Sequence, residues 1–360
     1  MIHLVGLPHT SLNDETYPAC AFTAKAVRWI EILDSLDRQV TAYWGGGEDN
    51  AACEVVEILS DDERRHLFGD HVATSLPHIG WEGTEHYWTE FLDRTIKELH
   101  TRLQPGDVIA LWGGWTQRRI VEEFRRDYTI IEPAVGYSGI NTEHTHCVFE
   151  SYAWMHHVYG KWQIQTGRPL DMVIPNFLRA NDFPMRPDGG FALFIGRLSE
   201  LKGPHVAAKL AKEAGIPLWV AGAGDLHFDG STIECTDGTL VDPVDEFLGV
   251  IGPEKRGVVM GSASVVIVPT QYIEPFGTVH AEALMAGVPV VTTDWGVFTE
   301  TVVQARDGYR FRTHDQGVAS VKAAPSLRGL RIREHAVRRF SMEAVSPMWD
   351  EWLELIENGG

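Results

Sequence analysis

The feature of the sequence that most constrains its fold is the alternation of short apolar runs with helical segments along a chain of 360 residues. In the first half, apolar runs rich in β-branched and aromatic residues lie at residues 2–7, 40–44, 108–112 and 129–135. Segments with helical spacing of apolar residues, such as residues 22–36 and 87–100, separate them. This alternation predicts an α/β fold built on parallel sheets.

The second half continues the pattern and carries polar residues where its strands end. Residues 264–269 predict a buried parallel strand, and residues 280–285 predict a helix that ends at Gly287. The turn between them contains Glu274, Pro275, Phe276 and Gly277. In open α/β sheets ligands bind outside the carboxyl ends of the strands, so we expect this turn to contact a ligand.

Two carboxylates, Glu274 and Glu282, flank this turn. Pro275 prevents the helix from extending back to Glu274, while Glu282 lies inside the helix on the same wall. Each carboxylate can accept hydrogen bonds from a pair of sugar hydroxyls, and Gly277 lets a ligand approach the N–H groups at the helix start. The alternative is that Glu274 only complements the helix dipole and that Glu282 is a solvated helix residue.

A strand-like run at residues 191–195 leads into Gly196 and Arg197, with Lys202 and Gly203 shortly after. Arginine offers a planar fork to phosphate oxygens and lysine a mobile point charge, so the pair suits a diphosphate. The alternative is an ordinary solvated loop. Two cations at a strand end are nevertheless notable in a chain with 31 Lys plus Arg against 50 Asp plus Glu.

Two later segments extend this candidate site. Gly222 and Gly224 follow the strand-like run at residues 217–221 and form a glycine-rich turn suited to phosphate or ribose. Leu248 and Val250 could offer an apolar ledge for a base. Each segment alone is weak support for a nucleotide site.

In their order along the chain, these segments resemble the donor-binding half of the retaining glycosyltransferases of family 4, which have the GT-B fold. The resemblance covers residues 170–303 and rests on short motifs found in the family's order. They are Val173 to Asn176 (VIPN), Gly196 to Gly203 (GR followed by KG), the GAG turn at Gly222, the FLG string ending at Gly249, Glu274 to Gly277 with Glu282, Gly287 to Val291 (GVPVV), and Gly296 with Glu300.

The resemblance implies that Arg197 and Lys202 hold the donor diphosphate and that Glu274 contacts the transferred sugar, which makes these three the catalytic residues. It implies that Glu282 binds the ribose hydroxyls. The other expected donor-binding residues are Gly196, Gly222, Gly224, Leu248, Val250, Phe276, Gly277 and Thr278. Fixed cations and helix N–H groups stabilise the charge that develops on the departing phosphate, so the resemblance implies no metal ion and no cofactor besides the nucleotide-sugar substrate. The sequence also lacks the Asp-x-Asp motif with which many other glycosyltransferases hold a divalent ion.

The GT-B fold implies two facing Rossmann-like domains with a cleft between them and a C-terminal helix that crosses back to the first domain. We expect an acceptor-binding domain at residues 1–176, a donor-binding domain at residues 177–340 and the crossing helix at residues 341–360. In that helix, Met348, Trp352 and Leu355 show helical apolar spacing.

The amino-terminal half departs from the family pattern. Many family members carry a histidine at a strand end near the middle of this domain, where this chain has Glu132 and then Tyr137. No Gly-Gly loop follows the first strand, where the chain reads GLPHTSLNDETYPAC and includes His9. Gly113 and Gly114 follow another strand and either contact a ligand or form an ordinary turn. These five residues are the candidate acceptor contacts.

Histidines gather at residues 139–160, a segment that contains His144, His146, Cys147, His156 and His157. Their spacing does not complete a set of four zinc ligands, so we predict no metal site there. We expect a mobile loop at residues 139–147 and an aromatic helix over residues 148–159.

Composition limits the remaining possibilities. The four cysteines are scattered, the chain opens MIHLVGLPH without the features of a signal peptide, and no run of 18 apolar residues occurs. These features predict a cytoplasmic protein without a membrane span. The formal net charge of −19 disfavours a large basic face for nucleic acid.

The sequence therefore predicts a metal-independent, retaining glycosyltransferase with a UDP- or GDP-linked donor and a saccharide or glycoconjugate acceptor. Three alternatives stay open. They are a glycosyltransferase that modifies DNA bases, a non-catalytic protein that binds sugar nucleotides, and a GT-B epimerase.

Overall fold

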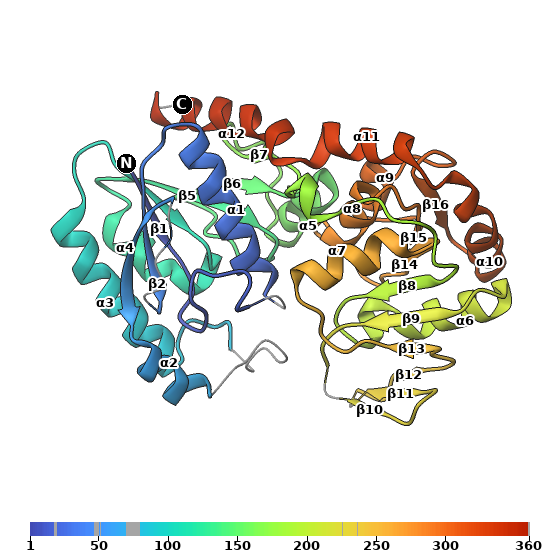
Figure 1. Ribbon diagram of the computed structural model, residues 1–360. Coiled ribbons are helices and arrows are strands. Elements are labelled where there is room, and N and C mark those ends of the chain that lie inside the picture. Colours follow the sequence, from blue (N-terminus) through green and yellow to red (C-terminus); the bar gives the residue numbers. More distant parts are fainter. Residues whose placement is uncertain are drawn as a thin grey trace. The chain divides into compact units, whose positions relative to one another are not determined.

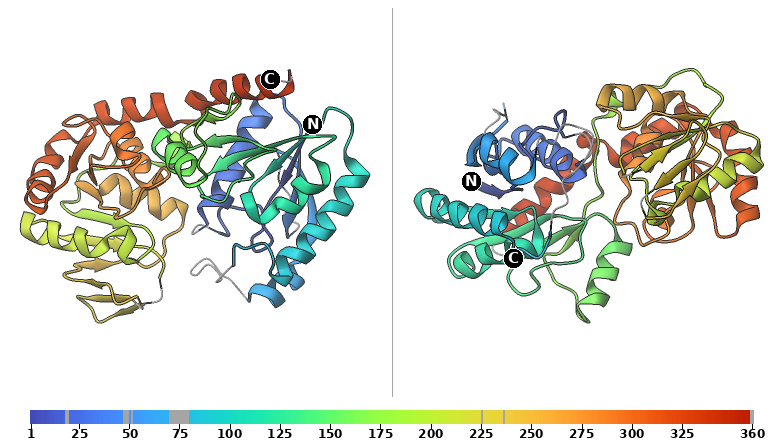
Figure 2. Two further views of the ribbon diagram at one scale, coloured as in Figure 1. Left: turned by 180° about the vertical axis from the view of Figure 1, so that it is seen from behind. Right: turned by 90° about the horizontal axis from the view of Figure 1, so that it is seen from below.

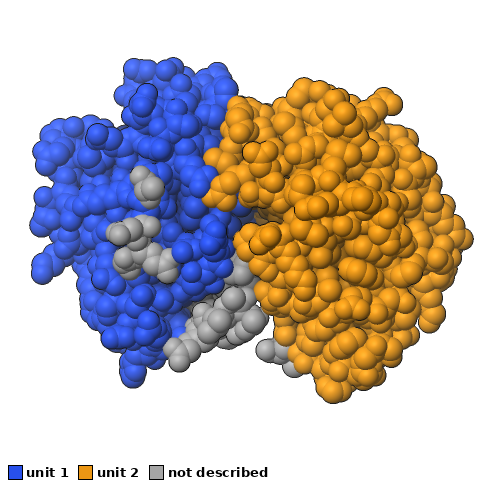
Figure 3. All heavy atoms as spheres, viewed as in Figure 1, with its two compact units in different colours: residues 1–150, 155–174, 345–360 blue, residues 151–154, 175–344 orange. Residues whose placement is uncertain are grey.

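The chain folds into two compact units, which Figure 3 colours separately. The computed structural model describes residues 1–17, 20–46, 50, 52–69, 80–224, 226–235 and 237–358. Unit 1 comprises Met1–Glu150, Met155–Ile174 and Val345–Gly360, and unit 2 comprises Ser151–Trp154 and Pro175–Ala344. Residues 151–154, which we expected in the first domain, thus lie in unit 2.

Unit 1 is built on a fully parallel sheet of seven strands in the order β3-β2-β1-β4-β5-β6-β7. The strands are β1 (Ile2–Val5), β2 (Val40–Gly45), β3 (Glu54–Leu59), β4 (Val108–Leu111), β5 (Thr129–Val135), β6 (His146–Phe149) and β7 (Met172–Val173). The helices are α1 (Ala21–Ser35), α2 (Asp61–Phe68), α3 (His86–Arg102), α4 (Arg118–Phe124) and most of α5 (Tyr152–Lys161) and α12 (Met342–Glu357), with the short 3-10 helix η1 (Gly114–Gln117) after β4. The first three residues of α5 and of α12 belong to unit 2. The strands predicted at residues 2–7, 40–44, 108–112 and 129–135 and the helices predicted at residues 22–36 and 87–100 are confirmed, with small shifts at their ends (Figure 1).

Unit 2 contains a six-stranded parallel sheet in the order β13-β9-β8-β14-β15-β16. Its strands are β8 (Ala192–Ile195), β9 (Leu218–Ala221), β13 (Glu246–Phe247), β14 (Val265–Val268), β15 (Val290–Thr293) and β16 (Gly308–Phe311). A small antiparallel sheet of β10 (Leu226–Phe228), β11 (Ile233–Cys235) and β12 (Leu240–Val241) follows β9, and the sequence did not predict it. Together the two parallel sheets confirm the predicted α/β class.

Successive side chains of each strand point to opposite faces of the unit 2 parallel sheet, and both faces are buried. In β14, Val265 and Ile267 pack in one core, whereas Val266 and Val268 pack in the other. The first core includes α6 (Pro204–Ala214) and α10 (His314–Ala323), and the second includes α7 (Pro253–Ser262), α8 (Thr278–Met285) and α11 (Leu330–Phe340). Figure 2 shows these helices from two further directions. Unit 2 also contains α9 (Phe298–Thr301) and the 3-10 helices η2 (Ala180–Asp182), η3 (Glu200–Lys202) and η4 (Ala324–Leu327).

One predicted segment is right only in part. A loop covers residues 139–145 and a helix, α5, begins at Tyr152, but between them His146–Phe149 forms the strand β6, which the sequence did not predict. The strand pairs with β5 on one side and β7 on the other, so sheet hydrogen bonding decides the conformation of an apolar run that is ambiguous by itself.

The predicted face of the C-terminal helix is confirmed at Trp352 but not at Met348 and Leu355. In α12 the buried residues are Val345, Trp349, Trp352, Leu353 and Ile356, whereas Leu355 is 45% exposed and Met348 only partly buried. The buried positions follow helical spacing from Val345 onward, and Trp349 packs against Trp29 of α1 at a ring-centroid distance of 5.6 Å. Within the described residues, no helix is long and apolar enough to cross a membrane.

Candidate active site

The turn between β14 and α8 holds the predicted carboxylate Glu274 in place. Gly277 caps α8 in the left-handed conformation, with φ of 69°. A Cβ atom at this position would lie 2.9 Å from Cγ of Glu274, so the turn has no room for a side chain. Glycine is therefore required both for the backbone angle and for the close approach of Glu274.

The buried side chain of Phe276 anchors the same turn in the hydrophobic core. Its side chain is 1% exposed, and its ring centroid lies 5.1 Å from that of His280 and 5.6 Å from that of Phe340. The side chain is thus part of the core, which leaves only the backbone of Phe276 for a ligand. Burial lowers the pKa of His280 to about 4, and its Nδ1 lies 2.6 Å from the carbonyl oxygen of Gly277. A neutral His280 therefore donates a hydrogen bond that supports the turn.

The carboxylate of Glu274 is only 6% exposed and contacts three side chains. Nζ of Lys202 lies 2.9 Å from Oε1 and 2.8 Å from Oε2. The hydroxyl of Tyr272 donates to Oε1 at 2.8 Å, and the hydroxyl of Thr270 donates to Oε2 at 3.2 Å. Both oxygens are therefore held in a fixed direction. Tyr272 contacts Lys202 too, because the ammonium group lies 5.1 Å from the centre of its ring.

Four of the predicted residues line one small cavity at the carboxyl ends of β8 and β14. They are Gly196, Lys202, Glu274 and Gly277. The cavity also contacts Val279 in the first turn of α8, where backbone N–H groups have no partner within the helix. Arg197 follows Gly196 directly and is exposed. The structure thus brings a cation, a carboxylate and a helix start to one place.

The turns that follow β8 and β9 contact each other closely at glycine residues. A Cβ atom at Gly222 would lie 1.7 Å from the carbonyl oxygen of Gly196, and one at Gly224 would lie 3.1 Å from that of Leu198. The N–H of Gly222 donates to the carbonyl oxygen of Gly249 at 2.9 Å, which ties in the turn after β13. These backbones approach one another so closely that the predicted glycines have a packing role, whatever they bind.

Glu282 has a partner that the sequence reasoning missed. Its carboxylate is 6% exposed, and Oε2 lies 2.6 Å from Nη2 and 2.8 Å from Nε of Arg256. Arg256 lies in the first half of α7, close to the helix start, where the dipole disfavours a cation. An arginine at this unfavourable position is the one sign in the sequence that its side chain has a specific acidic partner. Arg256 fixes the direction of the Glu282 carboxylate, so Glu282 is not a solvated helix residue.

The remaining predicted donor residues surround these groups. Leu248 and Val250 are partly buried after β13, and the Leu248 N–H donates to the Val220 carbonyl at 2.9 Å. The hydroxyl of Thr278 accepts a hydrogen bond from Nδ2 of Asn176 at 2.9 Å. Asn176 belongs to the VIPN motif, so this contact gives the motif a physical role at the start of α8.

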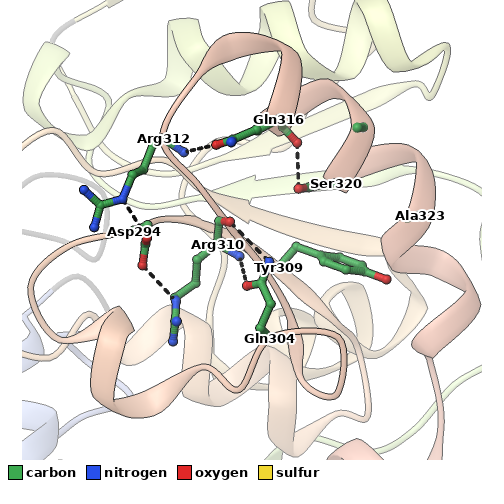
Figure 4. Close-up of a pocket in the computed structure, with 9 residues that line it drawn as sticks. Asp294, Gln304, Tyr309, Arg310, Arg312, Gln316, Ser320 and Ala323 are labelled. Carbon is green, nitrogen blue, oxygen red and sulfur yellow. Dashed lines mark hydrogen bonds and ion pairs between the residues drawn. The ribbon is translucent and has the colours of Figure 1, made fainter.

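A larger cavity of about 460 Å³ lies between β16 and α10, and none of the predicted residues lines it (Figure 4). Arg310 and Arg312 both contact the carboxylate of Asp294, and the hydrogen bond from Arg312 is the main cause that lowers the pKa of Asp294. The side chain of Gln304 accepts from the Arg310 N–H at 2.8 Å. The polar groups of the larger cavity thus pair with one another. The smaller cavity holds the predicted cation and carboxylate, so it is the candidate active site.

The candidate acceptor residues all lie in unit 1. Glu132 is 0% exposed, and its carboxylate accepts hydrogen bonds from Tyr137, Asn141 and Thr145. Burial raises the pKa of Glu132. This carboxylate therefore organises the loop after β5, and a direct contact with an acceptor stays a prediction.

The two glycines after β4 pack tightly in that loop region. Gly114 has φ of 56°, and a Cβ atom there would lie 2.1 Å from Cε2 of Tyr137. The N–H of Gly113 donates to the side chain of Gln117 at 2.8 Å. His9 is 3% exposed, with its ring 6.0 Å from that of Trp81. Within the described ranges, no group of three or more His, Cys, Asp or Glu side chains is placed to hold a metal ion.

Comparison with known proteins supports the fold and the kind of protein. Residues 180–324 match the family model "Glycosyl transferases group 1". The sucrose-phosphate synthase of Thermosynechococcus elongatus aligns over 100% of this chain and 99% of its own, with a TM-score of 0.73 at 17% identity. These matches support a family 4-like glycosyltransferase with the GT-B fold. The Anabaena protein HepE, solved in complex with UDP and glucose, has the same fold, with a TM-score of 0.65 at 16% identity over 99% of this chain and 100% of its own.

Curated relatives of the family match shorter stretches. D-inositol 3-phosphate glycosyltransferase of Paenarthrobacter aurescens is 34% identical over 155 residues, which are 39% of this chain and 37% of the relative. Phosphatidyl-myo-inositol mannosyltransferase of Mycobacterium leprae is 26% identical over 220 residues, which are 56% of this chain and 58% of the relative. The matches thus span less than two thirds of either relative.

Proposed function

We propose that this protein transfers a sugar from a nucleoside diphosphate donor to a saccharide or glycoconjugate acceptor, with retention of configuration and without a metal ion. The observation that carries the proposal is the contact of Lys202 with Glu274 beside the start of α8, at the carboxyl ends of β8 and β14. This place offers a cation for phosphate, a carboxylate for sugar hydroxyls and helix N–H groups within one cavity.

Each residue has a defined task in this proposal. Arg197 and Lys202 bind the diphosphate and stabilise the negative charge that grows on it as the bond to the sugar breaks. Glu274 accepts hydrogen bonds from hydroxyls of the transferred sugar. Glu282, held by Arg256, accepts hydrogen bonds from the ribose. The acceptor attacks from the face that the phosphate leaves, and the departing phosphate takes its proton, so retention needs no protein nucleophile.

The lysine must change partners when the donor binds. A carboxylate that is 6% exposed needs a compensating charge, and Lys202 supplies it. The diphosphate then competes for the ammonium group, while sugar hydroxyls take its place at Glu274. Coupling of these two exchanges favours a complete sugar nucleotide over a nucleotide or a sugar alone.

Binding is tested by thermal unfolding with UDP, GDP and their sugar conjugates in the presence of EDTA. A ligand at about 100 times its dissociation constant stabilises the folded protein by roughly 2.7 kcal/mol. We expect one nucleotide to raise Tm, and Arg197→Ala and Glu282→Ala to abolish the effect. If no nucleotide raises Tm, the proposal is wrong.

Turnover separates the enzyme from its alternatives. Slow release of nucleoside diphosphate from the matching sugar nucleotide, accelerated by a saccharide, is expected of the transferase, and NMR of the product gives the anomeric configuration. A non-catalytic binding protein would show the Tm shift without release. An epimerase would convert the sugar nucleotide or its sugar without an acceptor, and acceleration by DNA alone would indicate the nucleic-acid alternative.

A further inference from the structure

The loops at the carboxyl ends of the unit 1 strands converge on one another. Nε2 of Gln117, in η1 after β4, donates to the carbonyl oxygens of Val5 and Gly6 at the end of β1, at 3.1 and 2.7 Å. Nδ2 of Asn141, in the loop after β5, donates to the carbonyl oxygen of Gly114 at 3.1 Å. A parallel sheet binds its ligands at this edge, and the candidate acceptor residues of unit 1 lie there, whereas the candidate donor residues lie in unit 2.

Three aromatic side chains adjoin one another at this edge, and we call Tyr137, Phe22 and Trp81 the aromatic strip. The ring of Phe22, at the start of α1, lies 6.2 Å from that of Tyr137 with 29° between the planes. It also lies 6.2 Å from the ring of Trp81, which precedes α3. Trp81 is 45% exposed although indole is largely apolar. Its exposed face is therefore available to a partner with an apolar surface.

Packing contacts and one hydrogen bond hold the rings of Tyr137 and Trp81 in place. The ring of Tyr137 lies against Gly114, and its hydroxyl donates to the buried carboxylate of Glu132 at 2.9 Å. Trp81 also packs against His9 and Trp88, at ring distances of 6.0 and 5.9 Å. Rings fixed in this way lose little conformational entropy when a ligand stacks on them.

A carboxylate lies beside the strip. Glu150 follows β6 and is the charge partner of Lys25, whose Nζ lies 2.7 Å from Oε1. Lys25 is one helical turn after Phe22, and a Cβ atom at Gly136 would lie 3.3 to 3.4 Å from the carboxylate. Glu150 is therefore close to Gly136 and hence to the neighbouring Tyr137. Within the described part of the chain, the structure shows no hydrogen bond to its Oε2.

We propose that the aromatic strip, with the Glu150 carboxylate, binds a pyranose ring of the acceptor. This inference rests on the proposed function and adds the residues that select its acceptor. The C–H face of a pyranose is apolar and suits the exposed indole, while its hydroxyls can donate to the carboxylate. Lys25 is 3% exposed and already neutralised by Glu150, so the strip offers less to a phosphate backbone than to a neutral sugar.

The test uses saturation-transfer NMR on the full chain with the methyl glycosides of glucose, galactose, mannose and N-acetylglucosamine. Glucitol, which has hydroxyls but no ring, is the ligand control. We expect transfer to the C–H protons of at least one glycoside and none to glucitol. Trp81→Ala should weaken the affinity for that glycoside by about tenfold, and Trp81→Phe should restore part of it.

Leu355→Ala is the matched protein control, because Leu355 is also 45% exposed and lies on α12 of the same unit. It should leave glycoside binding unchanged. The inference is overturned if no glycoside binds better than glucitol, or if Trp81→Ala binds them as well as the parent does. The second result would place any glycoside elsewhere, for example at Glu274.

Nucleotide binding by the same variants separates this inference from the proposed function. Trp81→Ala should keep the full Tm shift with the donor nucleotide, because the donor residues lie in unit 2. A normal shift without glycoside binding overturns the acceptor inference and leaves the glycosyltransferase standing. Loss of the nucleotide shift in the parent protein overturns the proposed function itself.

Discussion

Lys202 contacts both carboxylate oxygens of Glu274, at 2.9 and 2.8 Å. The two residues come from turns after different strands, and the family resemblance assigns them to different parts of the donor. They neutralise each other inside a cavity where Glu274 is only 6% exposed. The pair is therefore part of the stability of unit 2 as well as of its chemistry.

The first prediction concerns the balance of charge in this pair. Lys202→Met leaves the Glu274 carboxylate without its cation, so the free energy of unfolding should fall by roughly 1–3 kcal/mol, allowing for the partly exposed lysine. The double variant Lys202→Met with Glu274→Gln should regain much of that loss, while neither variant binds the donor. Urea unfolding of the four combinations measures the coupling. Lys209→Met, at an exposed site on α6, is the control, and equal losses in the single and double variants would contradict the prediction.

The second prediction separates the sugar from the nucleotide. Tyr272→Phe removes the hydroxyl that donates to Glu274 at 2.8 Å but keeps the ring beside Lys202. A hydrogen bond to a charged group contributes roughly 1.5–3 kcal/mol, so hydrolysis or transfer from the sugar nucleotide should slow about tenfold or more. The affinity for the nucleoside diphosphate, which lacks the sugar, should stay unchanged. Tyr309→Phe in β16 is the control, and an equal fall in nucleotide affinity would show that Tyr272 acts on the fold instead.

The third prediction tests Glu282 as the ribose contact. If its carboxylate accepts hydrogen bonds from the ribose hydroxyls, the parent protein should bind the ribonucleoside diphosphate about tenfold more tightly than its 2′-deoxy form. Glu282→Gln should bring the two affinities close together, mainly by weakening the ribonucleotide. Arg256→Leu should do the same in part, because it frees the carboxylate to rotate. Calorimetry gives all six dissociation constants, and an unchanged ratio in Glu282→Gln would remove Glu282 from the ribose.

Sequence reasoning predicted that several candidate donor residues lie together, because these residues belong to short, contiguous motifs. Glu274, Gly277 and Lys202 each follow a strand closely. Ligands of α/β proteins bind at the carboxyl ends of parallel strands, and this rule was sufficient to predict that the three residues lie together. Contacts between distant segments were not predictable in this way. Neither Arg256 beside Glu282 nor Asn176 beside Thr278 has a local pattern that names its partner.

The errors of sequence reasoning also have physical causes. The strand His146–Phe149 has only four residues and sits in a segment rich in histidine and aromatic residues, so only its two neighbouring strands reveal it. In α12 several apolar residues compete for the buried face, and packing against Trp29 selects Trp349 rather than Met348. Trp81 and Phe22 are 59 positions apart, and only the fold brings their rings together.

The fourth prediction tests the close approach of two loops. A methyl group at position 222 would lie 1.7 Å from the carbonyl oxygen of Gly196, and the φ of 150° disfavours a side chain as well. Gly222→Ala should therefore lower the free energy of unfolding by about 3 kcal/mol or more and weaken nucleotide binding. Gly252→Ala is the control, because its φ is −70° and no atom lies within 4 Å of the added carbon. Similar stabilities of the two variants would contradict the structure of these turns.

The fifth prediction concerns pH and the histidine beneath the active-site turn. Burial lowers the pKa of His280 to about 4, so the folded protein keeps it neutral at pH values where the unfolded chain, with a pKa of 6.5, takes up a proton. Stability from His280 is therefore complete above about pH 6.5 and is lost as the pH falls toward 4, by roughly 3 kcal/mol over the whole window. His280→Gln should be less stable at pH 7 because it loses the contact with Gly277, but it should lose less further stability between pH 7 and pH 5. Urea unfolding at the two pH values gives this difference directly, and the other histidines contribute equally to both proteins. Equal pH slopes for the parent and the variant would mean that His280 titrates alike in the folded and unfolded states.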